Sequence, residues 1–214
     1  QTRTESDILV VDASKGFVKE GKNNKLRACD IRKIVDAVTT RQSIPNFSRL
    51  VSLSEIQANE YNLNIPRYVD SSDPAEPWDI YASMFGGIPA AEMDSLSAYW
   101  SAFPGLKESI SQTQTNGYYA ISMQDIRRNI REHDAVLSYK RRFAQVFEPL
   151  PQLIRAELIE KMHDAGIAEK ETGLSAYFLQ KAESLPLVDK YAVFQLFNDA
   201  WRGISADLEM ISTE

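Results

Sequence analysis

The side chains that most often carry out catalysis at neutral pH are sparse in this sequence. His133 and His163 are its only histidines, and each is expected on the polar side of a helix among charged residues, exposed at the surface. Neither has further ligands at the spacing that zinc requires. Cys29 is the single cysteine, which rules out an internal disulfide and a cysteine metal cluster. No histidine or second cysteine lies near Cys29, so it is not expected to be a nucleophile.

Short catalytic motifs are also missing. The 214 residues contain no Gly-x-Gly, no Pro-Pro and no Gly-x-Ser-x-Gly, and the phosphate-binding Gly-x-x-x-x-Gly-Lys-Ser/Thr does not occur in complete form. The carboxylate pairs Glu157/Glu160 and Glu169/Glu171 fall on charged helix faces, where solvation explains them. We therefore predict no catalytic, cofactor-binding or metal-binding residue in this chain.

Basic side chains form two groups that suit an anionic partner. Residues 1–69 carry 11 Lys and Arg against 8 Asp and Glu, a balance of +3, whereas residues 70–214 carry 13 against 22, a balance of −9. Because an acidic surface repels nucleic acid, any DNA contact is expected in the first third. The second group consists of Arg127, Arg128, Arg131, Lys140, Arg141 and Arg142. Acidic residues are interspersed with this group, so a solvated helix face is favoured over a partner or phosphate surface.

The first third of the chain must position its basic residues on an α/β fragment. Residues 7–14, DILVVDAS, are typical of a buried strand in a parallel or mixed sheet. A flexible basic loop is predicted at residues 15–25, and a helix at residues 28–42 with Asp30 as its candidate N-cap. A second strand is predicted near residues 48–52. Either the two strands pair with each other, or their partners lie in sequence that is absent here.

The segment EYNLNIPRYVD, residues 60–70, has no regular periodicity. A helical turn precedes it, because Ser52 followed by Glu55 three residues later is a capping-box pattern. Pro66 favours an extended conformation just before it. The asparagine side chains either satisfy the loop backbone or contact DNA or a partner, and the structural role is favoured. The acidic, proline-containing stretch DSSDPAEP follows, and it predicts a linker with a domain boundary near residues 70–76.

The remainder is predicted to be mostly helical. A helix should begin at Pro89 and carry an apolar stripe to Phe103, and another should begin at Ser122 and end or kink at Pro149 and Pro151. The most regular apolar stripe comes last. It consists of Leu187, Tyr191, Phe194, Phe197, Trp201, Ile204, Leu208 and Ile211. Long helices at residues 132–163 and 186–212 are expected to form an antiparallel hairpin.

Several of these segments together resemble a known family. ILVVDASKGFVKEGKNNKLRACDIRKIVDAV and FSRLVSLSEIQANEYNLNIPRYVD, within residues 8–70, resemble the downstream end of the methylation (M) subunit of type I restriction–modification systems. Residues 86–107 and 185–201 resemble the helical region of a longer branch of that family. The resemblance implies an adenine-N6 DNA methyltransferase that uses S-adenosylmethionine as cofactor. It also implies specificity (S) and restriction (R) subunits and DNA as partners, with the DNA target chosen by the S subunit.

The family's cofactor-binding and catalytic motifs, a Phe-x-Gly-x-Gly-type loop and Asn-Pro-Pro-Phe/Tyr, are absent from this sequence. Because these motifs must then lie upstream of Gln1, we expect a C-terminal fragment that has no cofactor of its own and is not catalytic alone. The start at Gln1 in place of Met agrees with a fragment, although processing or cloning also explains it. The predicted fold is mainly α. A small α/β remnant of a methyltransferase fold at residues 1–70 precedes a helical module with long antiparallel helices at residues 71–214.

The fragment is expected to serve subunit docking and DNA clamping in the cytoplasm, with no membrane partner. Nine residues are predicted to contact DNA or a partner subunit: Lys15, Lys19, Lys22, Lys25, Arg49, Asn62, Asn64, Arg67 and Tyr68. The alternative function is a stand-alone helical adaptor that binds only protein. These two functions make different predictions about the native gene, because the methylase reading requires the Gly-rich and Asn-Pro-Pro-aromatic motifs upstream of Gln1.

Overall fold

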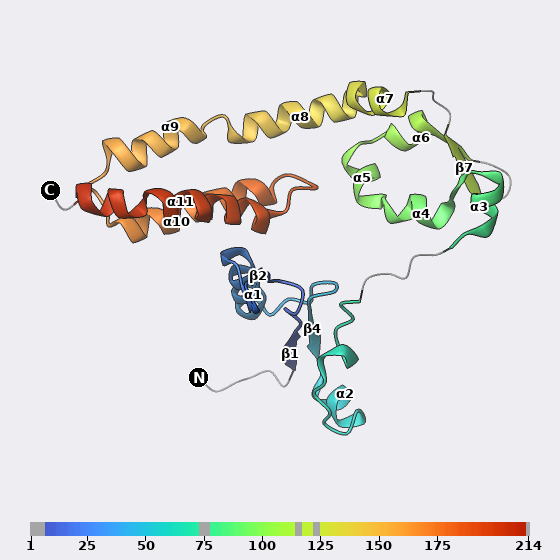
Figure 1. The fold of residues 1–214 in the computed structure, drawn as a ribbon, viewed down its shortest axis with the longest axis horizontal. Coiled ribbons are helices and arrows are strands. Elements are labelled where there is room, and N and C mark those ends of the chain that lie inside the picture. Colours follow the sequence, from blue (N-terminus) through green and yellow to red (C-terminus); the bar gives the residue numbers. More distant parts are fainter. Residues whose placement is uncertain (1–6, 73–77, 114–116, 122–124, 213–214) are drawn as a thin grey trace. The chain divides into compact units, whose positions relative to one another are not determined.

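The computed structural model describes residues 7–72, 78–113, 117–121 and 125–212. The chain divides into two compact units (Figure 1). The first unit holds residues 1–75, to which residues 194–199 are assigned, and the second holds residues 76–193 and 200–214. Helices predominate over small sheets, as predicted. Part of the predicted linker, residues 73–77, lies outside the described residues, and the boundary near residues 70–76 stays a prediction.

The two predicted strands of the first unit pair with each other. Strand β1 (Ile8–Val11) lies antiparallel to β4 (Ser48–Val51), with Ile8 opposite Val51. Among the described residues this sheet has two strands, and β1 is half-buried along its whole length. The expectation of a parallel or mixed sheet covered on both faces is therefore wrong for this structure, which realises the first of the two pairing alternatives.

The predicted flexible basic loop contains a second hairpin. Strands β2 (Val18–Glu20) and β3 (Asn23–Lys25) are antiparallel, and Gly21 in the tight turn between them has a φ of +64°. Residues 16–22 spell Gly-x-x-x-x-Gly-Lys, the first part of the phosphate-binding motif, but Asn23 follows. In that motif the segment connects a strand to a helix, so a β-hairpin here does not form a phosphate cradle.

Both helices of the first unit begin at recognisable caps. Helix α1 (Ala28–Thr40) has Arg27 as its N-cap residue, so the prediction of Asp30 as N-cap is wrong. Asp30 lies three positions later, where its carboxylate accepts a hydrogen bond from the Arg27 backbone N–H at 2.9 Å. Helix α2 (Leu53–Ala58) begins at Ser52, whose Oγ accepts from the Glu55 N–H at 3.2 Å. The predicted capping position at Ser52 is thus confirmed.

The core of the first unit joins its sheet to the chain that follows α2. Val51, Ile56, Tyr68 and Val69 are buried against one another, and side chains of β1 pack against this cluster. A short 3₁₀ helix, η1 (Ile65–Arg67), delivers Tyr68 and Val69 to the core. The C-terminal end of the segment 60–70 therefore belongs to the core of the first unit.

The second unit begins with short elements around a small sheet. They are α3 (Ile80–Phe85), β5 (Ile88–Pro89), α4 (Ala90–Ser95), α5 (Ser97–Ala102), α6 (Leu106–Ile110), β6 (Ser111–Thr113) and β7 (Tyr118–Ile121). The strands form an antiparallel sheet in the order β5-β7-β6, which the sequence analysis did not predict. Pro89 is the N-cap of α4, and the single helix predicted from Pro89 to Phe103 is instead interrupted at Leu96.

Longer helices complete the second unit. They are α7 (Ile126–Glu132), α8 (Asp134–Phe147), α9 (Leu150–Arg155), the π-helical turn η2 (Ala156–Glu160), α10 (Ile167–Glu183) and α11 (Lys190–Ser212). The predicted helix start at Ser122 lies outside the described residues, and the side chain of Asp125 caps α7. The helix is then interrupted at His133. Pro149 is the N-cap of α9.

Helix α10 was not singled out from the sequence, and it intervenes between the two helices predicted to form a hairpin. Side chains of α8 reach the connection from α10 to α11. The Tyr139 hydroxyl donates to the Pro186 carbonyl at 2.5 Å, and Arg142 donates to the Ser184 carbonyl at 2.7 Å. At the other end of α8, Val136 packs on Leu106 and Ile110. No helix within the described ranges is long and apolar enough to cross a membrane.

Candidate nucleic-acid and partner interface

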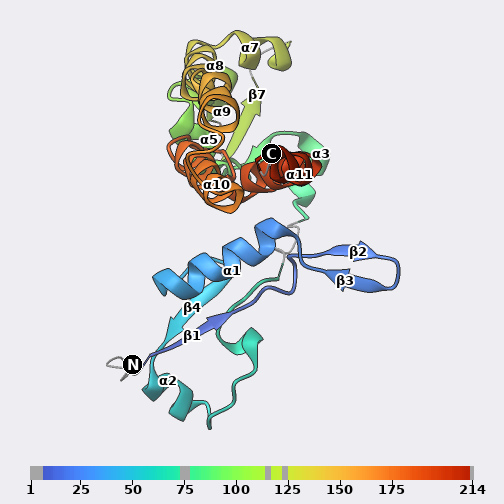
Figure 2. The same ribbon diagram turned by 90° about the vertical axis from the view of Figure 1, so that its left-hand side faces the viewer.

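The β2–β3 hairpin carries three of the predicted contact residues, and Lys15 lies shortly before it. Lys15, Lys19, Lys22 and Lys25 are all exposed. Lys25 pairs with Glu20 across the hairpin at 3.0 Å. Figure 2 shows the hairpin extending away from β1, β4 and α1. It can therefore approach a phosphate backbone without disturbing the core of the first unit.

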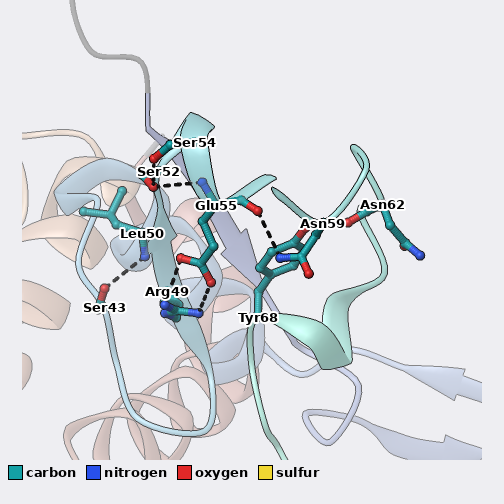
Figure 3. A network of polar contacts seen from close by, with 9 residues as sticks. All are labelled: Ser43, Arg49, Leu50, Ser52, Ser54, Glu55, Asn59, Asn62 and Tyr68. Carbon is teal, nitrogen blue, oxygen red and sulfur yellow. Dashed lines mark hydrogen bonds and ion pairs between the residues drawn. The ribbon is translucent and has the colours of Figure 1, made fainter. Parts of the chain in front are cut away.

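Arg49 is engaged inside the first unit. Its two terminal nitrogens donate to the two carboxylate oxygens of Glu55 at 2.9 and 3.0 Å (Figure 3). Such a bidentate pair fixes the guanidinium plane. Arg49 lies on β4 and Glu55 in the first turn of α2, so the pair joins these two elements. A phosphate contact at Arg49 would have to compete with Glu55.

Residues 59–68 form a loop held by its own side chains. Asn62 Oδ1 accepts from the Asn64 N–H at 3.0 Å. The Tyr68 hydroxyl donates to the Asn62 carbonyl at 2.5 Å, and Figure 3 shows these two residues side by side. Asn59 Nδ2 donates to the Glu55 carbonyl at 3.0 Å, which helps to end α2. These contacts are the structural alternative that the sequence analysis favoured for the asparagines.

The predicted contact residues in this loop differ in exposure. Tyr68 is 4% exposed, so its ring belongs to the core and presents little surface to a partner. Asn62, Asn64 and Arg67 are exposed. Arg67 is the basic residue of this loop, and its contact role stays a prediction.

A hollow of about 430 Å³ lies in the first unit between the chain around β4 and the end of the loop. Arg49 and Tyr68 line it together with Asn46 and Asp70. Asn46 has a φ of +56°, a left-handed conformation that asparagine tolerates better than most residues. The hollow's lining holds one arginine and one aspartate, so it does not present a uniformly basic surface to DNA.

Serine hydrogen bonds hold two carboxylates, Asp12 and Asp70. Asp12 accepts hydrogen bonds from the Ser71 hydroxyl at 2.5 Å and from the Ser14 N–H at 2.9 Å. The Ser71 hydrogen bond is the main cause that lowers the pKa of Asp12, and hydrogen bonds from Ser72 likewise lower the pKa of Asp70. The charge of Lys15 contributes to both shifts, so this lysine is near two anions.

The basic group of the second unit makes local contacts. Arg128 pairs with Glu132 at 3.0 Å, Arg141 Nε donates to the Leu137 carbonyl at 3.4 Å, and Arg142 donates to the Ser184 carbonyl. These contacts agree with the favoured reading of a solvated helix face. They do not make a joint phosphate site.

The histidines and the cysteine have no shared chemistry. His133 is half-buried at the junction of α7 and α8, where its Nδ1 accepts from the Ala135 N–H at 3.3 Å. His163 is exposed. Burial is the main cause that raises the pKa of the Cys29 thiol, which keeps it protonated at neutral pH. Across the described residues, no group of three or more His, Cys, Asp or Glu side chains could hold a metal ion.

Residues 1–76 match the N-6 DNA methylase family. The chain is 37% identical over 73 residues to the type I restriction enzyme MpnII methylase subunit of Mycoplasma pneumoniae. It is 40% identical over 76 residues to the type I restriction enzyme MjaVII methylase subunit of Methanocaldococcus jannaschii. Each match covers 34% of this chain and 13% of the relative. The chain therefore spans about an eighth of the length of these curated relatives.

A solved structure matches the same share of the chain. It is the type I restriction–modification system methyltransferase subunit from Streptococcus thermophilus, and the two sequences are 44% identical in the matched region. The match covers 34% of this chain and 15% of the solved chain, with a TM-score of 0.33. The first 76 residues are thus related to the N-6 DNA methylases, and the resemblance to type I methylation subunits is confirmed. The resemblance of residues 86–107 and 185–201 stays a prediction.

Proposed function

We propose that this chain is the C-terminal part of the DNA-modification subunit of a type I restriction–modification system. The match of residues 1–76 to N-6 DNA methylases is the observation that carries this proposal. The intact subunit would transfer a methyl group from S-adenosylmethionine to adenine N6. This chain would serve subunit docking and DNA clamping, and would not methylate DNA alone.

The lack of methyl transfer follows from the residues that such chemistry needs. An enzyme that modifies a flipped base must hold both the base and the cofactor in one pocket. The Gly-x-Gly and Asn-Pro-Pro motifs that do this in the family are absent from the sequence. The described first unit instead has a two-stranded β1–β4 sheet and the β2–β3 hairpin, which carries Lys19, Lys22 and Lys25 and is called the lysine hairpin below. These parts can contact DNA but cannot bind the cofactor.

The DNA contact would be made through phosphates. Lys19 and Lys22 are exposed on a protruding hairpin in the part of the chain that carries a net charge of +3. Lysine binds phosphate as a point charge and reads no base sequence. This fits a clamp that leaves the choice of DNA target to the S subunit.

Subunit docking would fall to the second unit. The C-terminal part of α11 exposes large apolar side chains, among them Met210 at 68% and Ile211 at 54%. Exposed apolar side chains of this kind serve as anchors when a partner covers them. The S and R subunits are the proposed partners.

The test uses the purified chain, the S subunit of the same system, and DNA that carries its target. The chain should co-elute with the S subunit in gel filtration and should transfer no tritiated methyl group from S-adenosylmethionine to the DNA. Measurable methyl transfer by the chain alone, or separate elution of the two proteins, would contradict the proposal. The stand-alone adaptor fails if the native gene continues upstream of Gln1 into the Gly-rich and Asn-Pro-Pro-aromatic motifs.

A further inference from the structure

Helix α3 and the residue before it expose four large apolar side chains. Trp78 is 89% exposed, and Ile80, Met84 and Phe85 are 73%, 70% and 69% exposed. Ile80 and Met84 are four residues apart, so their side chains adjoin on the surface of α3, while Trp78 precedes the helix and Phe85 is its last residue. We call Trp78, Ile80, Met84 and Phe85 the α3 patch. A contiguous exposed apolar patch marks an interaction site more often than a chance feature.

Hydrogen bonds and ring contacts hold α3 in place. Asp79 Oδ1 accepts from the Ala82 N–H at 2.8 Å and so caps α3, while its carboxylate also accepts from the Tyr118 hydroxyl of β7 at 3.0 Å. The Tyr81 ring lies against both Tyr118 and Phe85, with centroids 4.8 and 4.9 Å apart. The apolar side chains are therefore presented by a fastened helix, which lowers the entropic cost of binding.

A hollow opens beside the α3 patch. It has a volume of about 350 Å³, and its lining includes Trp78, Gly87 and Glu92. Glu92 is exposed and lies in the first turn of α4. The hollow thus sets an exposed indole beside an exposed carboxylate, a pair that suits a lysine or arginine side chain, since a cation is attracted both to the indole face and to the carboxylate.

The charges that line the hollow select the kind of partner. Its two charged lining residues, Asp79 and Glu92, are both acidic. Such a lining repels nucleic acid and attracts a basic side chain.

We propose that the α3 patch docks a basic amphipathic segment of a partner protein. Apolar side chains of that segment cover Ile80, Met84 and Phe85, while a lysine or arginine enters the hollow between Trp78 and Glu92. The inference deepens the docking role of the proposed function and rests on it for the partner's identity. The chemistry of the surface itself can be measured without any methylase component.

The experiment uses the full chain labelled with 5-fluorotryptophan. The chain has three tryptophans, so ¹⁹F NMR gives three signals, which Trp78→Phe and the 4% exposure of Trp201 help to assign. The probe is a synthetic helical peptide with leucines on one face and lysines and arginines on the other. Its control has the same leucine face and glutamates in place of the basic residues.

The basic peptide should shift the Trp78 signal and leave the Trp201 signal in place. Met84→Ser and Phe85→Ser should each weaken its binding by at least about tenfold, as loss of an interface anchor does. Glu92→Gln should weaken binding at low salt and have less effect at high salt. Ile159→Ser, at a residue 67% exposed on η2, is the matched control and should leave binding unchanged.

Equal binding of the glutamate peptide, or of duplex DNA, at Trp78 would overturn the proposal. So would a Trp78 signal that moves with protein concentration alone, because a second copy would then occupy the patch. If the basic peptide binds at Trp78 while the S subunit elutes separately, the inference stands and the proposed function fails. If the S subunit co-elutes and the basic peptide shifts no signal, the inference fails and the proposed function stands.

Discussion

Arg49 and Glu55 form a bidentate ion pair that joins β4 to the start of α2, with donor–acceptor distances of 2.9 and 3.0 Å. Both side chains are partly open to solvent, at 44% and 35% exposure. The pair therefore contributes modestly to stability, but it determines where a predicted DNA-contact residue points. It is the clearest case in this chain of a basic side chain with two competing roles.

Substitution of Glu55 separates those two roles. Glu55→Gln should lower the free energy of unfolding by less than about 1 kcal/mol, the range of exposed ion pairs. If Arg49 also contacts DNA in the assembled complex, the released guanidinium should bind phosphate more strongly. Urea unfolding and DNA titration measure the two effects, and Glu60→Gln, at an exposed residue, is the control. A loss of stability well above this range would show that the pair is a main support of the first unit.

Tyr68 and Arg67 are adjacent but should respond in opposite ways. Tyr68→Phe removes the hydrogen bond to the Asn62 carbonyl and should cost about 1 kcal/mol of stability without a direct effect on DNA binding. Arg67→Ala should leave stability nearly unchanged. It should weaken DNA binding by the full complex and lower the salt-dependence slope of that binding by the amount that about one phosphate contact contributes. Unchanged DNA affinity with lowered stability in Arg67→Ala would leave only a structural role for this arginine.

The Ser71–Asp12 hydrogen bond predicts how the free energy of unfolding changes with pH in the acidic range. The folded chain lowers the pKa of Asp12 below its ordinary value of 3.8, with the Ser71 hydroxyl as the largest cause. A lowered folded pKa stabilises the protein above the unfolded pKa, and that contribution is lost as pH falls through the folded pKa. Ser71→Ala should therefore reduce the fall in unfolding free energy on acidification below pH 3.8. An unchanged acid profile in urea unfolding would contradict this assignment.

Local signals in the sequence were enough for some elements and not for others. Ser52 and Glu55 predicted the start of α2 because a capping box is made by residues three apart. Asp30 was misassigned because its charge suits either the N-cap or the first turn, and only the backbone distinguishes them. The antiparallel pairing of β1 with β4 remained one of two alternatives, since it depends on long-range register that neither strand encodes alone.

Other features depend on contacts that the sequence pattern obscures. The β2–β3 hairpin was read as a flexible loop because its strands are short and exposed, although Gly21 marks its turn. Helix α10 was missed because two positions of its buried face hold polar residues, Ser175 and Lys170, the latter at 5% exposure. The Lys170 Nζ donates to the Lys161 carbonyl at 2.7 Å, and a hydrophobic periodicity does not predict a buried lysine.

The lysine hairpin gives the most direct test of the clamping role. DNA affinity should be measured for the S subunit alone, with the chain, and with the double variant Lys19→Gln/Lys22→Gln. The account predicts that the chain raises the DNA affinity and makes it depend more steeply on salt. In the double variant, the salt-dependence slope should fall by the amount that about two phosphate contacts contribute. Lys161→Gln is the control, because this exposed lysine lies outside the hairpin. If the chain leaves DNA affinity and salt dependence unchanged, it does not clamp DNA and the central claim is wrong.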